Sequence, residues 1–333
     1  MRIALLLLLT LPLCAEMKVL KTIPVGGEGG WDYLTVDPAT HRLFLSRGTR
    51  VDVLDLNTGK VTGAIPDTPG VHGIALNTRS GKGYISAGRA NTVVVFNLSD
   101  LKVESKIATG KNPDFILYDE PSGRVITFNG GSADATFIDA KSGTVAATLP
   151  LGGKPEAAVS DGAGKVYANL EDKAELAEID ARSAKVLRRI KLTGCEEPSG
   201  LALDVKHRRT FSGCGNHVMA VTSLEAGKVV ATIPIGPGVD ANGFDAERGL
   251  AFSSNGGDGT LTVAKETSDG RFEVVQNVPT QRGARTMALD PSTHHIFLVT
   301  AKFGTMPAAA PGGPRQRPPM VPGSFEVLEV GEN

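Results

Sequence analysis

Short runs of apolar and β-branched residues, broken by turn-forming residues at regular intervals, extend along the whole chain. The segment 110–149 carries four such runs, FILY, RVITF, ATFID and TVAATL. The connections between them are the turn sequences Pro121-Ser122-Gly123, Asn129-Gly130-Gly131 and Lys141-Ser142-Gly143. Strand-turn-strand patterning without a helical period of 3.6 residues predicts antiparallel strands joined by tight hairpins. Four such strands alone would leave two apolar faces exposed, so the segment needs neighbours of the same kind.

The four-strand unit repeats along the chain. The last strand of each unit ends in Ile, Leu or Val, and successive markers lie 42, 42, 42, 41, 43 and 45 residues apart. A fixed period in this range is typical of propellers and solenoids. Radial packing covers both faces of every sheet. A solenoid would need caps at both ends, and the sequence shows none. We therefore predict an all-β, seven-bladed β-propeller. The markers are Ile23, Ile65, Ile107, Leu149, Ile190, Ile233 and Val278.

The two ends of the chain supply complementary parts of one blade. Residues 324–331, SFEVLEVG, have the pattern of a third strand with no fourth strand after it. Residues 17–23, MKVLKTI, have the pattern of a fourth strand with nothing before it. We predict that the N-terminal strand pairs with the last blade and closes a ring in which every blade has four antiparallel strands. Residues 16–333 then form a single domain whose ring closure costs loop entropy only once.

These units resemble the YVTN-type β-propeller repeat. The similarity is carried by TVDPATHRLFLS (35–46), VDVLDLNTGKVTGAIP (51–66) and AGKVVATIPIG (226–236), and it extends over essentially the whole mature chain. It implies the propeller fold and says little about function, because such propellers serve many roles. Blade seven departs from the pattern through a Pro-rich insert, 304–323, which holds six prolines. That composition predicts an extended or mobile segment, either a tolerated surface excursion or a flap.

The N-terminus predicts export. Residues 1–15 combine Arg2, the apolar run IALLLLLTLPL and a plausible cleavage site before Glu16, which is the pattern of a signal peptide. The run is too short for a comfortable membrane span, and no other stretch is suitable. A lipoprotein anchored through Cys14 is disfavoured because Leu13 stands where a small residue is expected. We expect a periplasmic or secreted monomer.

The overall charge argues against one class of partner. Thirty-five basic and 36 acidic residues give a formal net charge of −1, and the basic residues form no runs. Nucleic acid is therefore not expected as a partner.

Two cysteines remain after the predicted signal peptide. Cys195 and Cys214 fall in loops on the same face of the fifth repeat. An even number of cysteines in an exported protein favours a disulfide. A catalytic cysteine paired with His217 is disfavoured, because it would need a reduced thiol in an oxidising compartment.

Candidate site residues lie where each repeat enters its first strand, because these segments point at the central channel of a propeller. Asp32, His72, Asp114 and Glu156 come from four consecutive repeats, and mixed oxygen and nitrogen ligands suit Ca²⁺, Mn²⁺ or Zn²⁺. The alternative is a polar lining of a wet channel with no bound ion. Trp31 either packs structurally or forms a stacking platform for a planar ligand. The ligand-binding candidates are Trp31, Asp32, His72, Asp114, Glu156, Ser199, Asn242 and Arg285.

The function expected from these features is that of an exported binding or scaffold protein with a ligand site at the channel mouth. The ligand is a small molecule or a protein. One alternative is a metal-dependent hydrolase of the lactonase type, which would use the same carboxylate and histidine cluster. Another is a module that binds a protein or surface polymer through its loops. The chain has no C-x-x-C-H, Walker, G-x-S-x-G or H-E-x-x-H motif, so no catalytic residue and no cofactor other than a divalent cation is indicated.

Overall fold

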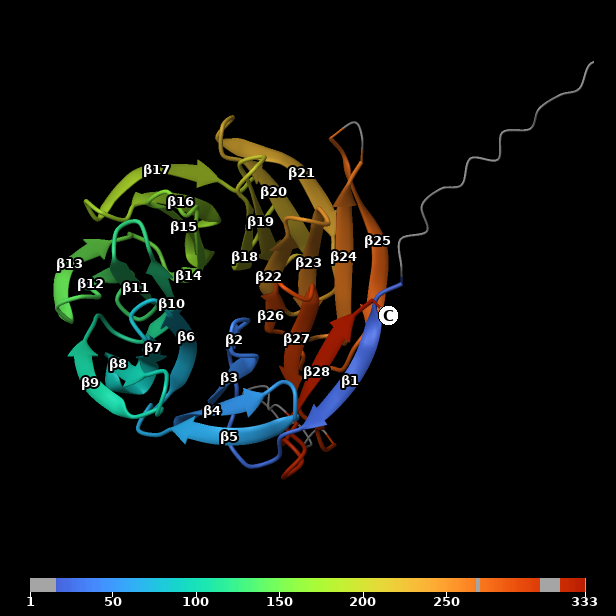
Figure 1. The fold of residues 1–333 in the computed structure, drawn as a ribbon. Helices are drawn as coiled ribbons and strands as arrows, with labels where there is room; N and C mark the ends of the chain where they lie inside the picture. The colour runs from blue at the N-terminus through green and yellow to red at the C-terminus, as the bar shows by residue number, and fades with distance from the viewer. Residues whose placement is uncertain (1–15, 268–269, 306–317, 333) are drawn as a thin grey trace, which may run out of the picture.

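The computed structural model describes residues 16–267, 270–305 and 318–332. In these residues, 28 strands form seven four-stranded sheets arranged as blades around a common centre (Figure 1). Every adjacent pair of strands within a blade is antiparallel, and the strand order follows the sequence in blades one to six. The predicted all-β, seven-bladed propeller is therefore confirmed.

The first four blades run in order from the N-terminal side of the chain. Blade one comprises β2 (Leu34–Asp37), β3 (Arg42–Arg47), β4 (Arg50–Asp55) and β5 (Lys60–Ile65). Blade two comprises β6 (Val71–Asn77), β7 (Lys82–Ala87), β8 (Thr92–Asn97) and β9 (Val103–Ala108). Blade three comprises β10 (Pro113–Asp119), β11 (Arg124–Asn129), β12 (Asp134–Asp139) and β13 (Thr144–Pro150). Blade four comprises β14 (Pro155–Ser160), β15 (Lys165–Leu170), β16 (Glu175–Asp180) and β17 (Lys185–Lys191).

The remaining blades complete the ring. Blade five comprises β18 (Pro198–Asp204), β19 (Arg209–Cys214), β20 (Val218–Ser223) and β21 (Lys228–Pro234). Blade six comprises β22 (Val239–Asp245), β23 (Leu250–Asn255), β24 (Thr260–Glu266) and β25 (Phe272–Pro279). Blade seven comprises β26 (Met287–Asp290), β27 (His295–Thr300), β28 (Glu326–Gly331) and β1 (Lys18–Pro24). Two single-turn 3₁₀-helices, η1 (Gly88–Ala90) and η2 (Glu171–Lys173), lie in loops.

Local turn chemistry explains the hairpins between the third and fourth strands. Asp139 Oδ1 accepts hydrogen bonds from the backbone and the hydroxyl of Ser142, at 2.9 and 3.1 Å. The residue after Ser142 is Gly143, whose φ of +69° is strained for any residue with a Cβ. An equivalent turn, with Thr58 in place of the serine, closes the last hairpin of blade one, where Gly59 has φ of +66°. A side-chain cap followed by a left-handed glycine therefore makes this turn at a position readable from the sequence.

The core lies between blades. The four central residues of β12 are all buried, whereas the outer strand β13 is mostly exposed. Ile126, Phe128 and Phe137 of blade three pack with Val166 and Ile179 of blade four in one buried cluster. Burying an aliphatic or aromatic side chain of this size stabilises the fold by about 1.5–3 kcal/mol. Each blade thus supplies the apolar surface that its neighbour needs, which is why the four-strand unit cannot stand alone.

The N-terminal strand closes the ring as predicted. β1 pairs antiparallel with β28, and Ile23 lies opposite Val327. Both side chains are fully buried, at 2% and 0% exposure. In Figure 1 the blue first strand lies along the red last strand, so the two ends of the chain share blade seven.

The predicted insert separates β27 from β28. An antiparallel bridge between Phe303 and Met320 joins the two sides of its base. Its central part, 306–317, and the predicted signal peptide, 1–15, lie outside the described residues. No helix among the described residues is long and apolar enough to cross a membrane.

The predicted disulfide is present. Cys195 and Cys214 are bonded, with their Cα atoms 5.4 Å apart. Cys195 lies in the loop before β18 and Cys214 ends β19, so the bond ties the start of the innermost strand of blade five to the strand beside it. Both residues are buried in the cluster between blades four and five.

Candidate functional site at the channel mouth

Each blade contributes one side chain from the same place, at or just before the start of its innermost strand. Figure 1 shows these seven strands, β2, β6, β10, β14, β18, β22 and β26, around the centre of the ring. The residue is the second of a seven-residue segment that reads VHGIALN in blade two and PDFILYD in blade three. Contacts between neighbouring members show that they gather at one end of the channel. We call them the mouth ring: Asp32, His72, Asp114, Glu156, Ser199, Asp240 and Arg285.

An irregular strand pairing holds these residues in place. In blades two to six the register between the first and second strands shifts within the first residues of the innermost strand. Such a shift bends the strand and leaves backbone groups without a ladder partner. Buried hydroxyl groups on the second strand of one blade instead donate hydrogen bonds to backbone carbonyls at the start of the next blade. Ser86 Oγ donates to the carbonyl of Asp114, and Ser254 Oγ donates to the carbonyl of Arg285, each at 2.5 Å.

A chain of hydrogen bonds links five of the seven ring members. Ser199 Oγ donates to Asp240 Oδ1 at 2.8 Å, and Arg285 Nε donates to Asp240 Oδ2 at 2.6 Å. The same guanidinium reaches Asp32 Oδ1 through Nη2 at 3.4 Å. Asp32 Oδ2 in turn lies 2.6 Å from His72 Nδ1. Burial opposes the charge on Arg285, but Asp240 and Asp32 outweigh it and raise the pKa of the guanidinium.

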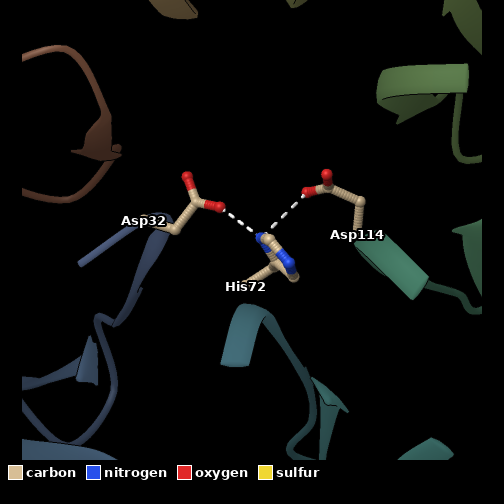
Figure 2. A group of neighbouring side chains, drawn as sticks. All are labelled: Asp32, His72 and Asp114. Atoms are coloured by element: carbon tan, nitrogen blue, oxygen red, sulfur yellow. Dashed lines mark hydrogen bonds and ion pairs between the residues drawn. The ribbon is translucent and has the colours of Figure 1, made fainter. Parts of the chain in front are cut away.

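His72 lies between two carboxylates. Figure 2 shows Asp32 and Asp114 on either side of the imidazole, with Nδ1 2.6 Å from Asp32 Oδ2 and 3.5 Å from Asp114 Oδ1. Burial lowers the pKa of His72, but the hydrogen bond to Asp32 and the charges of both carboxylates raise it to about 9. One ligand atom from each of the three residues lies within 4.8 Å of the others. The group is therefore compact enough to share one proton or one cation.

Burial is also the main influence on Asp114. It raises the pKa of this carboxyl, and the nearby charges of Asp32 and Asp240 act in the same direction, while His72 opposes them. The side chain retains 16% exposure, so it faces the mouth and not the blade interior. A positive charge at the mouth would therefore stabilise the ionised form of Asp114.

Glu156, the fourth member of the predicted metal set, has a different partner. Lys154 Nζ lies 2.6 Å from Glu156 Oε1 and also contacts Glu171. Burial and the charge of Asp114 raise the pKa of Glu156, against the opposing effect of Lys154. The structure thus brings three of the four predicted metal ligands together and pairs Glu156 with a lysine.

A cavity of about 190 Å³ occupies the channel below the ring. Its lining includes Tyr33, Phe115 and Asp240. Tyr33 and Phe115 meet edge to face, with ring centroids 5.2 Å apart. Tyr33 is only 8% exposed, and its hydroxyl makes no hydrogen bond to any residue that the structure describes. Burial raises the pKa of this phenol well above 10, and all four ring carboxylates act in the same direction.

Two sequence candidates lie outside the mouth ring. The indole of Trp31 packs against Phe303 and Phe325, with ring centroids 6.0 and 5.5 Å away, so it lies in the packing of blade seven against blade one. Asn242 Nδ2 contacts Met219 Sδ at 2.8 Å, which directs its amide toward blade five.

The sequence predicted Asn242 as the candidate in blade six, whereas the ring position is Asp240. Aligning the seven-residue segments and taking the second position of each identifies Asp240, because these segments have equal length. Tyr33 and Lys154 were not selected at all. Each is adjacent or nearly adjacent to a ring residue, but no pattern indicates which of several neighbouring polar groups turns into a channel.

The fold resembles solved structures at low sequence identity. A chain of the structure titled "Kuenenia stuttgartiensis Hydrazine Synthase" matches with a TM-score of 0.72 and 16% identity, over 84% of this chain and 94% of that one. A chain of the "Crystal Structure of Mitotic Checkpoint Complex" matches with a TM-score of 0.75 and 13% identity, over 90% and 95%. Neither a family model nor a curated protein matches the sequence. The similarities show the fold alone, and membership of the YVTN-type family stays a prediction.

Proposed function

We propose that the protein is an exported binding protein of the YVTN type, whose ligand site is the mouth ring and whose ligand carries positive charge. The observation that carries this proposal is the cluster of carboxylates at the mouth. Asp32, Asp114, Glu156 and Asp240 contribute four carboxylates there. The cations that contact them are Arg285, Lys154 and, when it is protonated, His72. Burial and neighbouring carboxylates raise the pKa of Asp114 and of Glu156, so a bound cation would favour the ionised forms of these two groups.

The arrangement is costly without a ligand. Like charges held close together in a partly buried site repel one another, and the low local dielectric strengthens that repulsion. Cross-blade hydrogen bonds to the backbone carbonyls of Asp114 and Arg285 hold these two residues at the mouth. A bound cation would relieve this repulsion, which gives the site a physical reason to bind one.

Export is supported by the disulfide, because such bonds persist in oxidising compartments. The hydrolase alternative would draw on the same carboxylates and has no additional observation in its favour. The polymer-binding alternative depends on the Pro-rich insert, whose centre lies outside the described residues.

Calorimetric titration with a panel of cations tests the proposal. The panel comprises methylammonium, spermidine, Ca²⁺, Mn²⁺ and Zn²⁺, and the protein is first dialysed against chelator. We expect at least one of these cations to bind the wild type, and the double variant Asp114→Asn/Glu156→Gln to bind it at least tenfold more weakly. Glu247→Gln is the matched control, because this carboxylate is 80% exposed and follows β22, at the opposite end of that strand from Asp240.

Two results would contradict the proposal. One is that no cation in the panel binds. The other is that the double variant and the Glu247→Gln control bind as the wild type does. A circular-dichroism melt of each variant establishes that its blades are intact, so that weaker binding is not confused with unfolding.

A further inference from the structure

We infer that Asp32, His72 and Asp114 form a binding site for one divalent transition-metal ion, of the Zn²⁺ or Mn²⁺ type. This inference rests on the proposed function, because it names the cation that the mouth ring takes. The three residues come from blades one, two and three, which are consecutive in the ring.

The distances between ligand atoms fit an ion after small side-chain shifts. Ligands at about 2.1 Å from a tetrahedral or octahedral ion lie roughly 3.0–3.4 Å from one another. The present separations from His72 Nδ1 are 2.6 Å to Asp32 and 3.5 Å to Asp114. The largest separation within the group is at most 4.8 Å. The two separations from His72 Nδ1 therefore lie just below and just above the range that an ion requires.

The ligand types favour a transition metal over calcium. One imidazole nitrogen with two carboxylates is a donor set that suits Zn²⁺ or Mn²⁺. Ca²⁺ takes six to eight oxygen ligands, and Glu156, the ring carboxylate of the next blade, is engaged by Lys154. Two carboxylates also match the charge of a divalent ion, so the group would be neutral when it is filled.

Neighbouring residues orient two of the three ligands. Arg285 contacts Asp32 through Oδ1, which leaves Oδ2 directed at His72. Such outer contacts commonly fix the orientation of metal ligands. The imidazole lies against Gly88, where an added Cβ would be 2.8 Å from His72 Nε2. Only glycine leaves room at position 88 for the ring in this orientation.

Tyr33, which follows Asp32 in the chain, lines the cavity below the mouth ring and is more than nine-tenths buried. Its hydroxyl makes no hydrogen bond to a described residue, so it can donate to a water or an anionic group in this cavity.

Titration with Zn²⁺ and with Mn²⁺, each alone, tests the inference on the full mature chain. We expect one ion per molecule, and at least a hundredfold weaker binding for His72→Gln and for Asp114→Asn. The matched control is Glu247→Gln, which removes an exposed carboxylate outside the mouth ring. It should bind within twofold of the wild type.

Substitution with Co²⁺ gives a second readout that does not depend on affinity. Its visible absorption should report mixed nitrogen and oxygen coordination in the wild type and lose that signature in His72→Gln. Binding of neither Zn²⁺ nor Mn²⁺, or equal binding by His72→Gln, would overturn the inference. Binding of methylammonium or spermidine without either metal would overturn the metal site and leave the cation-binding function standing, whereas failure of every cation would overturn both.

Discussion

Removal of the Cys195–Cys214 disulfide should destabilise the protein by an amount that follows from its loop. The bonded residues are 19 apart in sequence. Restricting the unfolded chain over such a loop is worth about 3 kcal/mol in the chain-entropy treatment. Replacing two buried sulfur atoms by hydrogen in Cys195→Ala/Cys214→Ala adds on the order of 1 kcal/mol of lost packing. With an entropy of unfolding of about 0.7 kcal/mol/K for a chain of about 320 residues, Tm should fall by about 5–6 °C.

Differential scanning calorimetry and urea unfolding of the oxidised wild type and the double variant measure this effect. Adding reductant is the internal control. It should lower the Tm of the wild type toward that of the variant and should leave the variant unchanged, because the variant has no bond to reduce. The affinity for cations should hardly change, since Asp32, His72 and Asp114 come from blades one to three and the bond lies in blade five.

The reasoning would be refuted by either of two outcomes. In the first, the variant and the oxidised wild type unfold at the same temperature. In the second, reductant destabilises the variant as much as the wild type, which would place the sensitivity outside this bond. A loss much larger than 5 kcal/mol would also disagree, because it would mean that blade five does not form without the covalent link.

Three further predictions follow from individual side chains. Ile23→Ala should cost about 2–5 kcal/mol, because Ile23 is buried in the strand that closes the ring, whereas the exposed Val61→Ala should cost little; urea melts compare them. Burial raises the pKa of Glu178, whereas hydrogen bonds from two basic partners lower it. The net effect is a lowered pKa. Glu178→Gln should therefore cost about 1–2 kcal/mol at pH 7, and the difference should shrink below pH of about 4.5; a constant difference would exclude an ionic origin. Tyr33→Phe should change the stability of the metal-free protein by less than about 0.5 kcal/mol, since the cavity beside its hydroxyl can hold water; a larger loss would reveal a partner for the phenol.

Much of the fold was predictable from the sequence, because its signals are local. The turn at Lys141-Ser142-Gly143 needs only an aspartate cap and a glycine at positive φ, and both are visible in the chain. The period of about 42 residues counts these turns and so counts the blades. The complementary end strands then left one way to close the ring. The disulfide followed because the fold puts its two cysteines on one face of one blade.

The candidate site was predictable in part. Knowing that innermost strands begin at the channel was enough to select Asp32, His72 and Asp114, and the structure brings their side chains together. This rule was insufficient in blade six, where Asp240 and Asn242 are two positions apart and both are polar. The register shift at the start of β22 places Asp240 in the ring and turns Asn242 toward Met219. Such a shift depends on pairing with the second strand, which a linear pattern does not contain.

By itself the sequence determined the number of blades, the strands, the turns and the closure, because each depends on residues a few positions apart or on a repeat period. Only the tertiary structure decided how charge is distributed at the mouth. Glu156 pairs with Lys154 and not with His72, and Arg285 binds Asp240 and Asp32 from the two neighbouring blades. Each of these side chains has several charged groups at similar distances, and differences of a few ångströms between blades determine which groups pair. The physical reason is that electrostatic energies fall with separation in space, whereas strand and turn preferences act along the chain.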